Sequence, residues 1–149
     1  MTRQRGIAAI EMALLLPVLA SLLAVALYFG RFFWHYTAAQ KAVHNAAIFL
    51  STIPPGDMKD LTRIAYATAM ANTLVSQELA ELHPGEAPVF TTVLCDYQLC
   101  NGLALPAEVR VSVQMRIDDI FLPAASQTLY DPTGGILITA NATLPYVGN

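Results

Sequence analysis

The hydrophobic pattern of the chain changes along its length, beginning with a segment that is apolar throughout. Residues 6–30 read GIAAIEMALLLPVLASLLAVALYFG, and Glu11 is the only charged residue among them. As a helix, twenty-five residues extend roughly 37 Å at ~1.5 Å per residue, which exceeds the ~30 Å hydrocarbon core of a bilayer. The pattern therefore predicts a transmembrane helix over about residues 7–30.

This helix is expected to continue beyond the apolar run. Residues 31–50 contain no Gly or Pro and are rich in good helix formers, which predicts one continuous helix from about residue 8 to 50. An aromatic group follows the span where the outer headgroups would lie, and its rings are suited either to that interface or to packing on the rest of the chain. It consists of Phe32, Phe33, Trp34 and Tyr36.

A second helix is predicted over residues 58–82, after a break at residues 51–56 (STIPPG). We expect Asp57 to be its N-cap, with Asp60 three residues later as in a capping box. Apolar and small residues recur there at steps of three or four, which is typical of a helix with one buried face. The expected face consists of Leu61, Ile64, Ala65, Thr68, Ala71, Val75, Leu79 and Leu82.

The last part of the chain alternates between apolar and polar residues with a period of two, which is typical of strands. Residues 89–97 are rich in β-formers, and residues 108–117 and 136–144 alternate cleanly, with an eighteen-residue connection between the last two. These patterns predict three or four antiparallel strands with one buried face. Combined with the helices, the predicted fold class is α+β.

Charge is distributed unevenly in this chain of 149 residues, whose formal net charge is −3. Arg3 and Arg5 precede the apolar run without any acid, whereas residues 31–149 contain six Lys or Arg and ten Asp or Glu. Since basic residues collect on the cytoplasmic side of a membrane span, we expect the N-terminus to stay inside and the rest to be exported. The acidic exported part argues against nucleic acid as a partner.

The chain has two cysteines, Cys95 and Cys100. In an exported domain this spacing favours a short disulfide loop, and a pair of reduced thiols is the alternative. Metal binding fits less well because two cysteines supply only half of a tetrahedral zinc shell. We therefore expect no metal site.

No group of residues predicts catalysis. His35 and His44 are nine residues apart, which places them on opposite faces of a helix, and His83 belongs to a predicted turn. The Asp118–Asp119 pair fits turn chemistry better than a cation site. Phosphate-binding loops, nucleophile elbows and zinc-protease motifs are absent from the sequence, so we expect no catalytic residue, cofactor or small-molecule substrate.

Glu11 requires an explanation because a carboxylate in an apolar helix costs roughly 2.5 kcal/mol or more near the bilayer centre, and less toward an interface. One alternative is that residue 11 lies close enough to the cytoplasmic face for its side chain to snorkel to water, so that the charge is only tolerated. It lies five residues after Gly6, in the context Arg5-Gly6-Ile7-Ala8-Ala9-Ile10-Glu11. This arrangement resembles the type IV pilin leader, in which a prepilin peptidase cleaves after the glycine. The resemblance implies that Gly6 and Ile7 flank the cleaved bond and that Glu11, the fifth mature residue, pairs with the N-terminal amine of a neighbouring subunit.

The stretch RGIAAIEMALLLPVLASLLAVALYFGRFF resembles more narrowly the N-terminal signature of TadE-like pseudopilins of tight-adherence (Tad/Flp) pilus systems. The C-terminal strands also resemble that family, whereas Met12 differs from the aromatic residue that often follows the Glu. The resemblance implies a pilin-like fold with a leader at residues 1–6, a helix at 7–50 and an exported domain at 51–149. It further implies a minor pilin of the bacterial inner membrane, with prepilin peptidase, other Tad pilins, the assembly platform and the lipid bilayer as partners, and a role in adhesion and biofilm formation.

Two other interpretations of the N-terminus stay open. The first is an ordinary signal peptide, because Ala24-Val25-Ala26 is an A-x-A site that would leave Leu27 as the new N-terminus. The second is an uncleaved signal anchor of an envelope protein without any role in pilus assembly. The uninterrupted apolar run through Phe29 argues against the first, which also gives Glu11 no purpose.

Overall fold

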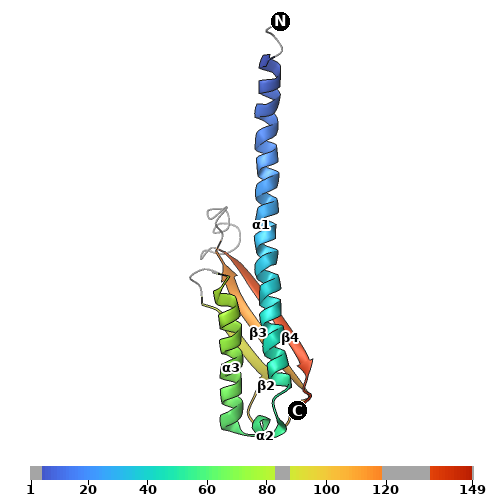
Figure 1. Cartoon of the computed structure of the whole chain (residues 1–149), viewed down its shortest axis with the longest axis vertical. Coiled ribbons are helices and arrows are strands. Elements are labelled where there is room, and N and C mark those ends of the chain that lie inside the picture. Colours follow the sequence, from blue (N-terminus) through green and yellow to red (C-terminus); the bar gives the residue numbers. More distant parts are fainter. Residues whose placement is uncertain (1–4, 83–87, 119–134, 149) are drawn as a thin grey trace. The chain divides into compact units, whose positions relative to one another are not determined.

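The structure is a computed structural model that describes residues 5–82, 88–118 and 135–148. The chain forms two compact units, Met1–Phe33 and Trp34–Asn149. Figure 1 shows the elements in chain order, and the fold is α+β with a pilin-like layout, as predicted. The elements are α1 (Arg5–Ser51), α2 (Pro55–Met58), α3 (Leu61–Ala80), β1 (Phe90–Cys95), β2 (Gln98–Leu99), β3 (Glu108–Ile117) and β4 (Ile136–Pro145).

The continuous first helix is confirmed, since α1 extends through Pro17 without a break and ends at Ser51. Among the described residues, one helix, Ala9–Ser51, is long and apolar enough to cross a membrane, with a mean hydropathy of 2.4 in its most apolar part. No residue of that part is buried. Length and composition fit a membrane span, and they fit a signal sequence near the N-terminus equally well. The helix therefore indicates a single-pass or signal-anchored protein.

The part of α1 that belongs to the second unit has one buried face. Its buried residues recur at steps of three and four, as expected for one face of a helix. Half of them are alanines, which allow neighbouring elements to approach closely. They are His35, Ala39, Ala42, Val43, Ala46, Ala47, Leu50 and Ser51.

The buried face of α3 differs from the predicted one by a small rotation about the helix axis. Its buried residues are Ile64, Ala67, Ala71, Val75 and Leu79. Leu61 and Ala65 are exposed and Thr68 is only partly buried, so their assignment to the buried face was wrong. Steps of three and of four both keep a residue on one face of a helix. The apolar spacing alone therefore did not decide whether position 67 or position 68 is buried.

The predicted N-cap of α3 was also wrong. Pro54 and Pro55 begin the short helix α2, which contains Asp57, and the side chain of Asp57 pairs instead with Arg63. Asp60 is the N-cap of α3, since its carboxylate accepts hydrogen bonds from the backbone N–H of Thr62 at 2.8 Å and of Arg63 at 3.1 Å. The separate turn α2 delays the start of α3 to Leu61.

Replacing Asp60 with alanine is expected to lower the free energy of unfolding of the second unit by about 1 kcal/mol, the usual value of an N-cap. The reason is that two N–H groups of the first turn of α3 lose their acceptor. Asp57→Ala is the matched control, because it removes an exposed ion pair that contributes little. Urea unfolding measures both variants, and an equal loss in both would contradict the assignment of the cap.

The four strands form one antiparallel sheet in the order β2-β1-β3-β4. The clean alternation predicted for β3 and β4 is confirmed in the structure. Val109, Val111 and Val113 of β3 are fully buried, whereas the residues between them are partly exposed. β1 ends at Cys95, two residues before the predicted end, because the chain turns there into the short strand β2.

The C-terminal end of the chain joins the end of α1. The Tyr146 hydroxyl donates to the backbone carbonyl of Ile53 at 2.7 Å, and the backbone N–H groups of Val147 and Gly148 donate to the carbonyl of Ser51 at 3.0 and 3.2 Å. Burial raises the pKa of the Tyr146 hydroxyl above its ordinary value. These bonds anchor the end of β4 beside the end of α1.

Four predictions concern residues outside the described part of the chain. The turn at residues 83–88 and its His83 fall there except for Pro88, and so does Asp119. The predicted connection from Asp118 to Gly135 is described only at its two ends. The leader is described only from Arg5 onward.

Candidate functional site

The predicted cleavage site lies at the beginning of α1. Gly6 and Ile7 belong to the first helical turn, which starts at Arg5. The structure describes their backbone conformation, and the assignment of the bond between them as the cleaved bond stays a prediction. In the sequence, this site is identified only because the residues around it resemble a type IV pilin leader.

Glu11 lies on α1 within a helix surface that is exposed and apolar on all sides. Its chain neighbours Ile10 and Met12 are 66% and 63% exposed. A helix with apolar side chains around its full circumference is stable only in lipid or among other apolar helices. Among the side chains that the structure describes from Ala9 onward, those around Glu11 are apolar and offer its carboxylate no charged partner.

A second feature is the hairpin between β1 and β2. Cys95 and Cys100 form a disulfide across it, and Cys95 lies opposite Gln98 in the strand register. The two residues of the turn, Asp96 and Tyr97, have φ angles of 49° and 65°. Positive φ at both turn positions defines a tight hairpin turn, a conformation that aspartate adopts readily and that is strained for tyrosine.

Hydrogen bonds from Asp96 hold this turn against the start of β3. Its carboxylate accepts from the backbone N–H of Ala107 at 2.9 Å and of Glu108 at 3.0 Å, and its own N–H donates to the carbonyl of Glu108 at 3.1 Å. The guanidinium of Arg110 lies 4.5 Å from the ring centroid of Tyr97, within reach of a cation–π interaction. Sequence reasoning missed these roles, for which the only signal was an acidic residue directly after the first cysteine.

Replacing both cysteines with serine is expected to lower the free energy of unfolding by about 2 kcal/mol, as estimated from loop closure for a ring this short. The strained turn at Asp96 and Tyr97 would then depend on its hydrogen bonds alone. Chemical unfolding with and without a reductant measures the effect on wild-type protein and on the double variant. Reductant is expected to destabilise the wild type only, and equal unfolding curves of both oxidised proteins would contradict the prediction.

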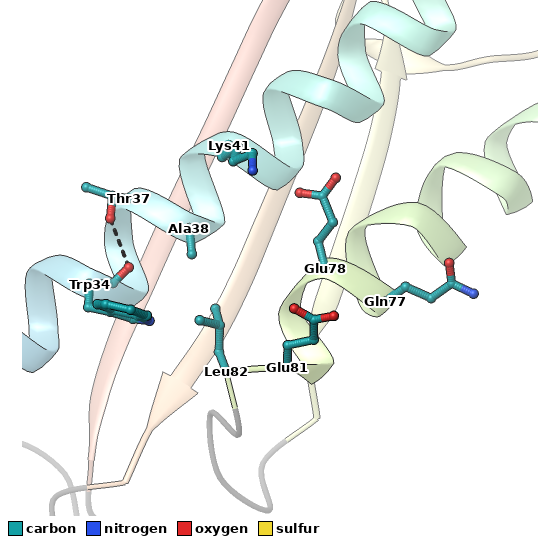
Figure 2. A pocket seen from close by; sticks show the side chains of 8 residues that line it. All are labelled: Trp34, Thr37, Ala38, Lys41, Gln77, Glu78, Glu81 and Leu82. Carbon is teal, nitrogen blue, oxygen red and sulfur yellow. Dashed lines mark hydrogen bonds between the residues drawn. The ribbon is translucent and has the colours of Figure 1, made fainter.

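A groove lined by described residues lies within the second unit, between α1 and α3, and has a volume of about 670 Å³. Figure 2 shows Trp34 and Lys41 on the α1 side and Glu78 and Glu81 on the α3 side. The two helices are joined by the side chain of Asn45, which donates to Glu78 at 2.8 Å. The described residues that line the groove include no Ser, Cys or His.

The two described histidines, His35 and His44, lie apart on α1. His35 is buried whereas His44 is exposed, which agrees with the prediction that they lie on different faces of the helix. Within the described part of the chain, no three His, Cys, Asp or Glu side chains lie close enough to hold a metal ion.

Residues 6–47 match a family model described as TadE-like protein. The match covers the apolar part of α1 and most of its buried part. Comparison with curated proteins gives no match, and neither does comparison with solved structures.

Proposed function

We propose that this chain, which is TadE-like over residues 6–47, is a minor pilin or pseudopilin of a Tad/Flp pilus. The observation that carries the proposal is the position of Gly6, Ile7 and Glu11 at the start of an apolar helix that lies within the matched residues. The proposed role is structural and non-enzymatic. It consists of initiating, capping or supporting a pilus that is used in adhesion and biofilm formation.

In this proposal a prepilin peptidase cleaves the chain between Gly6 and Ile7 on the cytoplasmic side of the membrane. Cleavage removes residues 1–6 and creates a positively charged amine on Ile7. A carboxylate that faces such an amine in poorly hydrated surroundings forms a strong, charge-assisted hydrogen bond. Glu11 of one subunit would pair in this way with Ile7 of its neighbour and would set the position of the two helices along each other.

We further propose a single-pass topology in the bacterial inner membrane. Arg3 and Arg5 would keep the N-terminus in the cytoplasm, and the apolar part of α1 would span the bilayer. Residues 51–149 would form the exported α+β domain. A disulfide between Cys95 and Cys100 is consistent with an oxidising compartment outside the cytoplasm.

The partners proposed for this protein follow from the same features. Prepilin peptidase acts on the leader, the lipid bilayer surrounds α1 before assembly, and other Tad pilins replace the lipid during assembly. The inner-membrane assembly platform would then act as a partner during pilus assembly. Exposed apolar side chains over residues 9–34 provide a surface for both lipid and neighbouring helices.

Deleting the gene from its native host tests the proposed function. Electron microscopy is expected to show loss of Tad pili or a strong reduction in their number, and surface attachment is expected to fall with it. A plasmid copy of the wild-type gene should restore both. Normal pili in the deletion strain would favour a signal-anchored envelope protein without an assembly role.

A further inference from the structure

The loop between β2 and β3 contains the one Asn-Gly pair of the sequence, Asn101 and Gly102. Asn101 directly follows Cys100, and its side chain is exposed. The amide carbon of an asparagine side chain can be attacked by the backbone nitrogen of the next residue. Glycine favours this attack, because it has no side chain that obstructs the approach and its backbone adopts the widest range of conformations.

The backbone nitrogen of Gly102 is available for such an attack. Within the described residues, no hydrogen bond involves the N–H of Gly102. The nitrogen has to lose its proton in the reaction, and an N–H that is bonded in a helix or a sheet resists this because the hydrogen bond would be lost. Gly102 is also partly exposed, so water reaches the nitrogen.

The side chain of Asn101 is held in place for the same step. Its Oδ1 accepts a hydrogen bond from the backbone N–H of Leu103 at 3.1 Å. This bond closes a ring of atoms that contains both Cγ of Asn101 and the nitrogen of Gly102. When the nitrogen attacks Cγ, negative charge develops on Oδ1, and a donor that already points at this oxygen stabilises the charge.

The other described asparagines lack this arrangement. Asn45 and Asn72 lie within α1 and α3, where the N–H of the following residue belongs to the helix. Asn141 lies in β4, and Ala142 after it pairs with Val111 of β3. In each case the next residue has a Cβ atom and a backbone that is fixed by regular structure. These three asparagines are internal controls for the reactivity of Asn101.

We propose that Asn101 is a site of spontaneous covalent modification, which converts it mainly to isoaspartate. The nitrogen of Gly102 forms a bond to Cγ of Asn101, and the bond from Cγ to Nδ2 breaks. The proton of the attacking nitrogen passes through water to Nδ2, which leaves as ammonia. Water then opens the resulting succinimide: attack at the backbone carbonyl gives isoaspartate, and attack at Cγ gives aspartate.

Isoaspartate would disturb the contact between this loop and α3. Its main chain passes through Cβ and Cγ, which lengthens the backbone by one carbon–carbon bond of about 1.5 Å. The space at Gly102 is too small for such a change. A Cβ atom added there would lie 2.9 Å from the backbone nitrogen of Leu61 and 3.1 Å from the backbone carbonyl carbon of Asp60.

The two ends of the loop cannot absorb the added length. Cys100 is joined to Cys95 by the disulfide, and the N–H of Ala107 donates to the carboxylate of Asp96 at 2.9 Å. Between these anchors the loop has to move away from α3 at Gly102, so the first turn of α3 loses a segment that packs on it. The modification requires only water and the folded second unit, and it does not depend on the proposed pilus function.

Ageing of the purified full-length protein in detergent tests the proposal. The folded protein is incubated for days in mildly alkaline buffer, and its peptides are followed by mass spectrometry. Asn101 is expected to be lost to two acidic products that chromatography separates, with the isoaspartyl form in excess, while Asn45, Asn72 and Asn141 remain amides. Asn101→Gln is the matched control, because its amide has to close a larger ring and is expected to persist.

Three outcomes would overturn the proposal. The first is an unchanged Asn101 in the aged protein. The second is equal conversion at Asn141, which would make the reaction independent of the loop. The third is conversion that occurs only in protein unfolded with urea, which would show that the fold protects Asn101.

Urea unfolding of the aged protein tests the consequence for α3. The midpoint of unfolding is expected to shift to a lower urea concentration than in fresh protein, and aged Asn101→Gln is expected to keep its midpoint. Asn101→Asp adds the same charge on a backbone of normal length, so fresh Asn101→Asp is expected to unfold close to fresh wild type. Equal midpoints of aged wild type and fresh Asn101→Asp would contradict the displacement of the loop.

Discussion

A chain with Gly6 replaced by leucine is expected to retain residues 1–6 completely. The resemblance to pilin leaders implies that the peptidase accepts a glycine before the cleaved bond, and a branched side chain at that position would exclude the chain from its site. Intact-mass spectrometry of the protein from its native host measures the result. The variant should have its original N-terminus, whereas the wild type should begin at Ile7.

Gly30→Leu is the matched control for this variant. Both glycines belong to α1, and a Cβ atom added at Gly30 has no neighbour within 4 Å. The same substitution at Gly30 should therefore leave processing unchanged. If the Gly6 variant were processed as efficiently as the Gly30 variant, the cleavage site would lie elsewhere.

Glu11→Ala is expected to be processed and inserted normally but to fail in pilus assembly. Removing the carboxylate makes the helix easier to insert, by roughly 2.5 kcal/mol if the residue lies near the bilayer centre. Assembly would nevertheless fail, because the amine of Ile7 in a neighbouring subunit would lose its charged partner in poorly hydrated surroundings. Counting pili on a deletion strain that expresses the variant measures the result.

Glu11→Asp provides the control for charge. It keeps the carboxylate on a side chain that is one methylene shorter, and pili should be partly restored. Glu11→Gln keeps the size but removes the charge, and pili should remain absent. Normal pili with Glu11→Ala would contradict the assembly role of this residue.

The sequence predicted those parts of the fold that have strong periodicity. β3 was predicted over residues 108–117 and has those bounds, because alternating valines between polar residues fit only a half-buried strand. The length of α1 was predicted to within a few residues, since its interior contains one proline and no strong stop signal before residue 51. In both elements, local pattern and tertiary structure agree.

The errors lie where tertiary contacts decide between two local possibilities. Asp57 and Asp60 both fit an N-cap in sequence, and the extra turn α2 selects Asp60. Ala67 rather than Thr68 is buried in α3, since both are compatible with helical spacing. The sequence also gave no sign of β2, a strand of only two residues beside the turn at Asp96.

The candidate site was also predictable only in part from physical reasoning. Physical reasoning alone identifies Glu11 as anomalous, since a charge inside an apolar helix is costly. It does not identify the bond between Gly6 and Ile7, because a peptide bond carries no signal of its own cleavage. That assignment came from the resemblance of the surrounding residues, and the family match over residues 6–47 supports the same interpretation.

The mass of the mature protein, isolated from its native host, tests the central claim most directly. Cleavage after Gly6 predicts a chain that begins at Ile7, with or without an added methyl group on its amine. A chain that begins at Leu27 would establish conventional secretion. A chain that begins at Met1 or Thr2 would establish an uncleaved anchor, and either result would contradict the proposed pilin processing.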